Sequence, residues 1–562
     1  MTSSMESHCI SFRELPQTAK LFASFLEDFS RVSRYYTHPP TESGVVAASR
    51  EISLDAGIRR EVDEVLREQN RNFGADGATE RNLDRLAAGA VAIVTGQQVG
   101  LFSGPIYSCY KALSAVRWAE AISRRGTDAV PIFWLATEDH DLAEINHAFW
   151  NTRHGLERFE LPARQADAGK RVGEIVLGDE IIALVAKATE TLEGAFADDA
   201  IRALRESYTP GETYGSAFGK LMARLLAGRG IIFLDPLDAR FHRLASGVYR
   251  RALDESDALR DALAARSKEL ERGGFHAQVK IPGEASLLFY NVDGRRLPLR
   301  KHNGKFTAGA ASFAREELHT AIEKSPEAFS ANVLLRPVVQ DTLLPTAAYI
   351  GGPAEIAYMA QAQVVYQKIL GRMPAILPRA SFTIVESHIA RLLATYGLEF
   401  RDVLHGRQRV RSKMDIKSLP RGLARRFDSG EKALRRLLKS YAKPLDRLDR
   451  TLSGARDTVE RTILHQFLKL KAKAGRAEGL RNGVLDRHER LILDALYPNK
   501  GLQERSLCAL PFFAAFGPGL LDDLSRGCCP GKSKLASARR SAKRPTGATS
   551  ARDSFEHRIV FL

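Results

Sequence analysis

An α/β fold built around a parallel sheet is what this 562-residue sequence predicts. Two apolar runs, 90–94 and 130–136, each stop at polar residues and are separated by a helical pattern. A further apolar run at 343–350 precedes a Gly-Gly-Pro turn and another helical pattern. Strand–loop–helix units of this kind build parallel sheets with helices on their faces. Since the carboxyl ends of such strands form the ligand-binding edge of the sheet, the polar residues after these runs are the first candidates for a site.

The first apolar run ends at a glycine-rich loop, TGQQVGLFSGP, residues 95–105. Glycine allows a ligand to approach the backbone closely, and the helix expected after Pro105 could hold an anion at its N-terminus. The glycine spacing matches neither GxGxxG nor the P-loop, so an ordinary turn is the alternative. Two adjacent glutamines favour a site, because a plain turn needs neither. The residues predicted here to bind substrate or nucleotide are Thr95, Gly96, Gln97, Gln98, Gly100 and Gly104.

The second apolar run ends at four ionisable residues that we predict to be catalytic: Glu138, Asp139, His140 and Asp141. Groups this close shift one another's pKa. At a strand end they suit general acid–base work or metal ligation, and we predict no metal. The alternative is a solvated loop that caps the next helix, with Asp141 as N-cap and Glu144 in the first turn. Both interpretations can hold together.

The third unit supplies further candidates for binding substrate or nucleotide: Asn332, Arg336, Asp341, Gly351, Gly352, Glu355 and Arg379. A charged Arg336 among Leu and Pro needs either a partner or a ligand. It could clamp a carboxylate or phosphate with two hydrogen bonds. The alternative is a buried structural pair with Asp341 or Glu355. Arg379, which follows the apolar stretch MPAILP, is a second candidate of the same kind.

The charge and the cysteines limit the class of protein. The formal net charge is +16, but the segment 525–553 alone holds eight Lys or Arg residues against one acid. This segment is rich in Ser, Ala, Gly and Pro, so we expect a disordered insertion and no specific nucleic-acid partner. A secretory signal is not evident, and the uncharged stretch 86–110 is too often interrupted by polar residues and glycine to span a membrane. Five cysteines without metal spacing suit the cytoplasm.

Cys109 is expected in the first turn of the helix after the glycine loop, where a lowered thiol pKa would allow a nucleophilic role. The alternative, which we favour, is a small buried helix residue. Farther along, apolar residues from Leu434 to Leu470 alternate by four and three. They predict a helix of about 55 Å that dimerises as a coiled coil, or one that packs on a neighbouring helix at 480–496.

Longer motifs now allow a comparison with a known family. The segments VTGQQVGLFSGPIYSCYKALSA and VPIFWLATEDHDLAEINH stand in the first two units, and GGFHAQV begins at Gly273. They are followed by SANVLLRPVVQDTLLPTAAYIGGPAEIAYMAQ, by MPAILPRASFTIVE and by the ending HRIVFL. In these motifs and their order, over most of its length, the chain resembles the BshC family, the cysteine-adding enzymes of bacillithiol biosynthesis.

The resemblance implies an α/β, Rossmann-like, nucleotidyltransferase-type core with inserted connecting regions and a C-terminal α-helical coiled coil. We place the core at 1–400 with insertions at about 151–228 and 245–330, the coiled coil at 401–500 and the C-terminal segment at 501–562. The resemblance also implies a cytoplasmic ligase that joins cysteine to the amine of glucosaminyl malate. ATP could take part as a cosubstrate, and a homodimer through the helical region is expected. The alternative is a noncatalytic nucleotide-binding or scaffold protein, because fold alone does not fix function.

Overall fold

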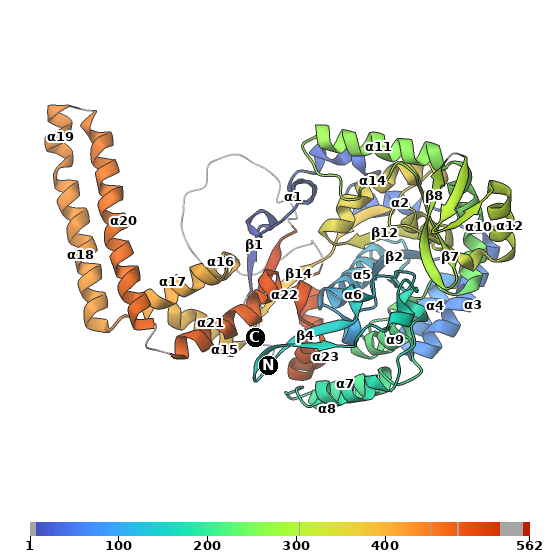
Figure 1. The fold of residues 1–562 in the computed structure, drawn as a ribbon, viewed down its shortest axis with the longest axis horizontal. Coiled ribbons are helices and arrows are strands. Elements are labelled where there is room, and N and C mark those ends of the chain that lie inside the picture. The colour runs from blue at the N-terminus through green and yellow to red at the C-terminus, as the bar shows by residue number, and fades with distance from the viewer. Residues whose placement is uncertain (1–6, 303, 450, 480–482, 529–554) are drawn as a thin grey trace.

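The computed structural model describes residues 7–302, 304–449, 451–479, 483–528 and 555–562. Figure 1 shows an α/β body and a long helical arm that projects from it. The predicted basic insertion at 525–553 falls largely outside the described residues; its first residues are helical, because the last helix runs to Arg526. In the described part of the chain, no helix has both the length and the apolar character needed to cross a bilayer.

A five-stranded parallel sheet forms the centre of the body, in the order β13-β12-β2-β3-β6. Its strands are β2 (Val91–Gln97), β3 (Ala129–Leu135), β6 (Ile232–Leu234), β12 (Thr346–Gly351) and β13 (Ala375–Pro378). The chain starts at β2, moves outward through β3 to β6, then returns to the other side of β2. The order therefore reverses between β2 and β12, and a crevice opens at their carboxyl ends.

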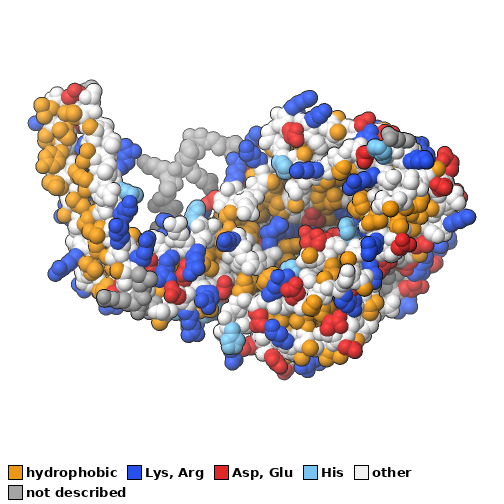
Figure 2. All heavy atoms as spheres, viewed as in Figure 1, with side chains coloured by type: hydrophobic (Ala, Val, Ile, Leu, Met, Phe, Trp, Pro, Cys, Tyr) orange, Lys and Arg blue, Asp and Glu red, His pale blue; other side chains and the backbone are white. Residues whose placement is uncertain are grey.

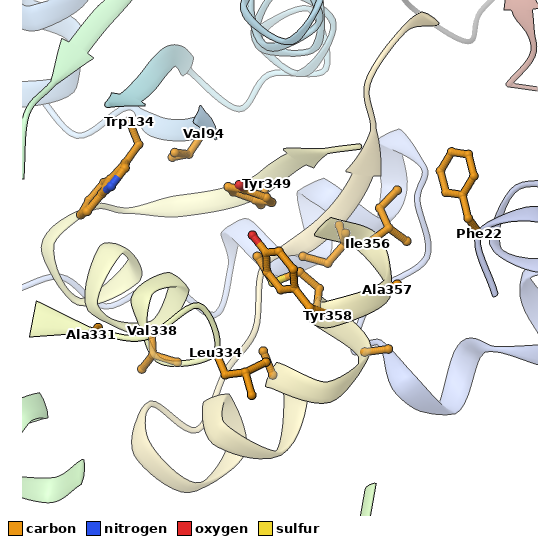
Figure 3. Packing of buried hydrophobic residues seen from close by; sticks show 14 of the residues in the cluster. Phe22, Val94, Trp134, Ala331, Leu334, Val338, Tyr349, Ile356, Ala357 and Tyr358 are labelled. Carbon is orange, nitrogen blue, oxygen red and sulfur yellow. The ribbon is translucent and has the colours of Figure 1, made fainter. Parts of the chain in front are cut away.

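Helices cover both faces of this sheet, which explains why its strands are continuous apolar runs. Val91 and Ile93 pack toward α5 (Tyr107–Ser123), whereas Ala92 and Val94 face the opposite core cluster. Figure 3 shows that opposite core, where Trp134 and Tyr349 from the strand ends lie near Tyr358. The helices of this second face are α3 (Ala56–Phe73), α4 (Gly77–Ala87), α10 (Ala239–Asp254), α13 (Arg336–Leu343) and α14 (Pro353–Ile369).

Two sets of elements are inserted between the core strands. The first comprises α6 (Leu142–Ile145), the hairpin β4 (His147–Thr152) and β5 (Gly155–Glu160), then α7 (Glu180–Thr189), α8 (Ala197–Ser207) and α9 (Tyr214–Leu225). The second comprises α11 (Ser256–Arg272), β7 (Ala285–Val292), β8 (Arg295–His302), β9 (Lys305–Ala308), β10 (Ala311–Phe313), α12 (Arg315–Lys324) and β11 (Phe329–Ala331). The strands of the second set form an antiparallel sheet beside the crevice.

The two ends of the chain meet in a small sheet next to the body. Strand β15 (His557–Phe561) lies between β1 (Ser7–Ile10), which is antiparallel to it, and β14 (Ser381–Val385), which is parallel. The remaining elements near the body are α1 (Lys20–Glu27), α2 (Glu42–Ser49), α15 (Ser387–Tyr396), α16 (Phe400–Leu404), α21 (Gly483–Leu496), α22 (Gln503–Ser506) and α23 (Leu510–Arg526).

The helical arm corrects the prediction of one continuous 55 Å helix. The predicted seam is divided among α18 (Arg421–Ser440), α19 (Ala442–Leu448) and α20 (Leu452–Gly479). The chain reverses between α19 and α20, so α20 packs back on α18, α19 and also α17 (Arg407–Lys417), as Figure 1 shows. Part of the seam is thus satisfied within the hairpin, where Leu438 and Leu464 are buried. The expected neighbour at 480–496 packs instead on α15 and α17 through α21.

Candidate functional site

A cavity of about 510 Å³ opens at the crevice between β2 and β12. Figure 2 shows a hollow in the face of the α/β body in which charged side chains gather. The cavity is bordered by the loops after β2, β3 and β12, by α13 and by the inserted antiparallel sheet. The predicted residues that line it are Gly96, Gln97, Gln98, Glu138, Asp139, His140, Asn332, Arg336, Gly352, Glu355 and Arg379. The structure therefore brings together candidates that are up to 283 positions apart in the sequence.

Glu138 is the most unusual acid of this cavity. It lies three residues after the end of β3, is only 8% exposed, and its Oε1 atom has no hydrogen-bond partner in the described residues. Burial raises the pKa of Glu138 to about 7, although Arg296 and Arg171 favour the charged form. A carboxyl group with such a pKa can accept or donate a proton near neutral pH.

Asp139 and His140 are held in place by neighbouring side chains. Gln98 donates to Asp139 (2.9 Å) and to Glu144 (2.6 Å), so this glutamine joins the two loops. The Arg296 guanidinium donates to His140 Nδ1 at 3.0 Å. Because a guanidinium can only donate, Nδ1 is the acceptor and the neutral ring carries its proton on Nε2. Burial and the charge of Arg296 lower the pKa of His140 below its ordinary value.

A buried lysine anchors the opposite wall. Lys111 on α5 is 2% exposed and forms an ion pair with Glu355 at 2.6 Å. Its ammonium group also donates to the Gly96 carbonyl (2.7 Å) and to Gln97 Oε1 (2.8 Å). Glu355 accepts further hydrogen bonds from the Tyr349 hydroxyl and the Gly352 N–H. This network ties the loop after β2 to the start of α14, and so fixes the two sides of the crevice relative to each other.

Arg336 is a charge in this cavity for which the described residues provide no acidic partner. Its guanidinium donates to Gln340 (3.0 Å) and Tyr349 (3.4 Å) and lies near the Trp134 ring. In the described part of the chain it forms no ion pair with a carboxylate, so neither predicted structural pair, with Asp341 or with Glu355, is present. A half-buried guanidinium of this kind suits an anionic ligand group.

Two models of one protein family match this chain. Residues 5–380 match the family model described as "Bacillithiol biosynthesis BshC, N-terminal Rossmann-like domain". Residues 382–531 match the model described as "Bacillithiol biosynthesis BshC, C-terminal coiled-coil domain". The chain belongs to the BshC family.

The similarity to curated relatives in the BshC family covers nearly the whole length of both chains. A protein of Koribacter versatilis is 41% identical over 93% of this chain and 98% of its own. A protein of Solibacter usitatus is 36% identical over 91% and 96%, and one of Salinibacter ruber is 31% identical over 90% and 93%. All three are named "Putative cysteine ligase BshC". The predicted family and the Rossmann-like and coiled-coil parts of the fold are thus confirmed.

Several predicted site residues of this BshC member instead have structural roles. Arg379 lines the cavity, but its guanidinium is held by buried Glu504, with contacts of 2.6 and 3.1 Å. Asp341 is buried outside the cavity and accepts hydrogen bonds from Tyr366 and Gln340. Each of these two groups already has partners that satisfy its charge or hydrogen bonds, so neither is free to bind a ligand.

Other predicted binding residues also fall outside the cavity lining. Thr95 is buried and donates to the Ile350 carbonyl at 3.0 Å, which links β2 to β12. Gly351 contributes to the turn before α14 but does not line the cavity. Asn332 lines it, yet its Oδ1 also accepts from the N–H groups of Leu334 and Leu335, at the start of the α13 region. Thr95 and Gly351 therefore support the site from outside its lining, whereas Asn332 combines a lining position with a structural hydrogen bond.

Two glycines of the glycine-rich loop allow its backbone to pack closely on itself. A Cβ atom on Gly100 would lie 2.9 Å from the Gly104 Cα, and Gly104 has a φ of +60°. Neither glycine lines the cavity, and the N–H of Phe102 is bound to the Tyr208 hydroxyl. The prediction that these two glycines contact ligand is therefore wrong: the backbones pack on each other, which only glycine permits.

Exposure and burial bear on two further residues, Asp141 and Cys109. Asp141 is exposed, lies outside the cavity lining and occupies the N-cap position of α6 without a side-chain capping bond. Its catalytic assignment therefore lacks support from the geometry. Cys109 is buried, and burial raises the pKa of its thiol to about 12. The alternative of a small buried helix residue is confirmed for Cys109.

Sequence reasoning missed several residues that line the cavity: Tyr107, Lys111, Trp134, Phe289, Arg296, Tyr349, Tyr358 and Arg505. Lys111 could have been found, because it is one charge inside an otherwise apolar helical stretch. Arg296 and Arg505 carry no such signal, since each lies among other charged residues in the sequence. The assembled site offers a buried acid, a neutral imidazole and a guanidinium without an acidic partner.

Proposed function

We propose that this protein is a ligase that joins the carboxyl group of cysteine to the amine of glucosaminyl malate. Family membership and the names of the relatives support a cysteine ligase. The observation that carries the proposal is Glu138, a cavity-lining acid whose carboxyl is buried and short of hydrogen bonds. Burying such a group costs stability. A scaffold protein would gain nothing from that cost, whereas an enzyme gains a proton acceptor.

Amide formation requires a neutral amine, because an ammonium group has no electron pair with which to attack. In the proposed reaction, the Glu138 carboxylate takes one proton from the sugar ammonium, which becomes the nucleophile. Arg336 binds a carboxylate of the malate part and so orients the amine. Trp134, Tyr349 and Tyr358 form an aromatic wall beside Arg336 that excludes water (Figure 3).

ATP is proposed as the cosubstrate, because a free carboxylate needs an activating group before an amine can attack it. The group that fits its phosphates is Arg505, which lies in the cavity lining with Arg336, the group assigned to malate. The glycine loop fits them less well, since the N–H groups of Gly100 and Gly104 bind carbonyl groups of the loop itself. When bound, ATP would supply the leaving group for the cysteine carboxyl.

The direct test is turnover of cysteine plus glucosaminyl malate by the purified full chain, with and without ATP, followed by mass spectrometry. We expect the amide product, and faster formation with ATP. Product formation without ATP would overturn the cosubstrate assignment. If neither condition yields the amide while the folded protein still binds glucosaminyl malate, the ligase proposal fails.

Arg336→Met is expected to raise KM for glucosaminyl malate by about tenfold to a hundredfold, because it removes a charge-assisted hydrogen bond of about 1.5–3 kcal/mol. Arg336→Lys should recover only part of this loss, since an ammonium group cannot make the bidentate contact. Steady-state kinetics with each substrate varied in turn measures the effect. An unchanged KM for glucosaminyl malate in the methionine variant would assign the guanidinium to another role.

We also propose that the protein is a homodimer that pairs through the helical arm. Apolar side chains remain exposed on the hairpin, and Figure 2 shows them along the arm. The large ones are Leu423, Leu437, Tyr441, Leu448, Val459, Ile463, Leu468 and Leu470. A contiguous apolar surface of this kind is uncommon on a monomer and favours association.

Val459→Glu combined with Ile463→Glu should convert the dimer into monomers, because it places charges in the apolar contact. Both residues are exposed within one chain, so the hairpin itself should stay folded. Light scattering coupled to size exclusion measures the mass, and Thr462→Glu on the same helix serves as the control. A monomeric wild-type protein at micromolar concentration would contradict the proposal.

A further inference from the structure

Next to Glu138 lies a second buried side chain, one atom of which lacks a hydrogen-bond partner in the described residues. His242 on α10 has a side chain that is 1% exposed, and its Nε2 atom lies 3.8 Å from Glu138 Oε1. In the described part of the chain, both of these atoms lack a hydrogen-bond partner. Two facing buried polar atoms, each without a partner, would each cost free energy unless they serve one another.

The other side of the histidine ring is already fixed. His242 Nδ1 lies 3.1 Å from the hydroxyl of Tyr249, which is about two turns farther along the same helix. Tyr249 is fully buried, so its hydroxyl cannot exchange this bond for water. The ring is therefore held with Nε2 directed at Glu138, and a shift of less than one ångström would bring the two atoms within hydrogen-bonding distance.

Charged groups surround this pair from several elements. Arg296 on β8, Arg336 on α13 and Arg171 favour the ionised form of Glu138, whereas Asp235, just after β6, disfavours it. Burial outweighs these charges and raises the pKa of Glu138 to about 7. Burial and the positive charge of Arg171 lower the pKa of His242 to about 4, although the Phe329 backbone and Asp238 act in the opposite direction. At neutral pH the ring is thus uncharged, and a proton entering the pair resides on Glu138.

We propose that His242 is a positioning residue for Glu138: its neutral Nε2 accepts a hydrogen bond from the protonated carboxyl group of Glu138, so that the two residues form a dyad holding one proton. The inference rests on the proposed function in one respect only, namely that Glu138 serves as the base. In the amine-activation step, the N–H bond of the ammonium group breaks and an O–H bond forms on Glu138. The new O–H then donates to His242 Nε2, and the amine keeps its electron pair.

This arrangement has a chemical consequence. A protonated Glu138 bonded to His242 is turned away from the amine, which hinders return of the proton before the amide forms. A glutamine at position 242 would instead donate an N–H to the carboxylate, which favours the charged form. The pKa of Glu138 should then fall, and the Glu138 carboxyl should hold its proton less strongly than in wild type.

The test compares wild type with His242→Gln, and uses His488→Gln as the matched control. His488 also binds a tyrosine hydroxyl, that of Tyr396 at 2.6 Å, but it lies on α21 outside the cavity lining. The first readout is infrared titration of the buried carboxylic acid, taken as the difference from Glu138→Gln. The second is the acid limb of the kcat/KM profile against pH.

We expect the titration midpoint and the acid limb to fall together by about one unit in His242→Gln, and to stay unchanged in His488→Gln. An unchanged midpoint in folded His242→Gln would overturn the dyad. If that variant does not fold, the wild-type spectrum decides: bands of a carboxylic acid whose O–H donates a hydrogen bond support the dyad, and those of an acid with a free O–H overturn it. The infrared readout needs no substrate, so a failure of the ligase proposal would be seen separately, as absent turnover.

Discussion

Glu138→Gln is expected to lower kcat by about 10²- to 10⁴-fold, the usual contribution of a positioned general base. The amide has nearly the shape of the carboxyl group but cannot accept the proton of the amine. Because the native carboxyl is buried without a partner for Oε1, its replacement should not lower the thermal midpoint. Steady-state turnover and a thermal melt measure the two effects.

Asp141→Asn is the matched control, since it makes the same kind of change on an exposed residue of the same loop. It should retain near-normal turnover. For wild type, kcat/KM should rise with pH through about 7, because the base must be ionised and the pKa of Glu138 is raised to about 7. Near-normal turnover of Glu138→Gln would remove the residue from the chemistry and leave only its structural role.

The parallel sheet and the place of its ligand site could be predicted from sequence, for physical reasons. Strands buried on both faces must be apolar throughout, so 90–94 and 130–136 stand out as runs. The polar residues that follow them lie at the carboxyl edge by topology alone. For this reason the sequence alone identifies Gln97, Glu138 and Glu355 as candidate site residues.

The pairing of the charged side chains could not be predicted, because their partners are distant in the sequence. The sequence shows that Arg336 and Arg379 are charges in apolar surroundings, but not that Glu504 satisfies Arg379 and leaves Arg336 without an acid. The same holds for Arg296, which reaches His140 from an inserted sheet. Spacing within one segment carries no information about these long-range contacts.

The helical arm illustrates a limit of periodicity. An apolar spacing of four and three shows that a helix face is covered, but not by which helix. The same pattern is produced by a long helix in a dimer and by two antiparallel segments joined by a turn. Here Asp449 and Thr451 at the reversal form a local hydrogen bond, which is a weak signal among many polar residues.

Lys111→Met should destabilise the fold by about 3–5 kcal/mol, the usual effect of removing one partner of a buried ion pair. The variant would leave Glu355 facing Tyr349 without its counter-ion. Thermal and urea unfolding measure the loss. Arg202→Met, which breaks an exposed pair with Asp199, should leave the thermal midpoint unchanged.

The double variant Lys111→Met with Glu355→Gln should recover much of the stability, because the uncompensated charge is gone. The pH dependence gives a further check. Burial alone would raise the pKa of Glu355, but Lys111 and the Gly352 N–H hold it below its ordinary value. A lowered carboxyl pKa stabilises the fold above the unfolded pKa, and that stability is lost as pH falls through the folded pKa. The gap between wild type and Lys111→Met should therefore narrow in acid; a gap that is constant with pH would show that Lys111 acts through packing rather than charge.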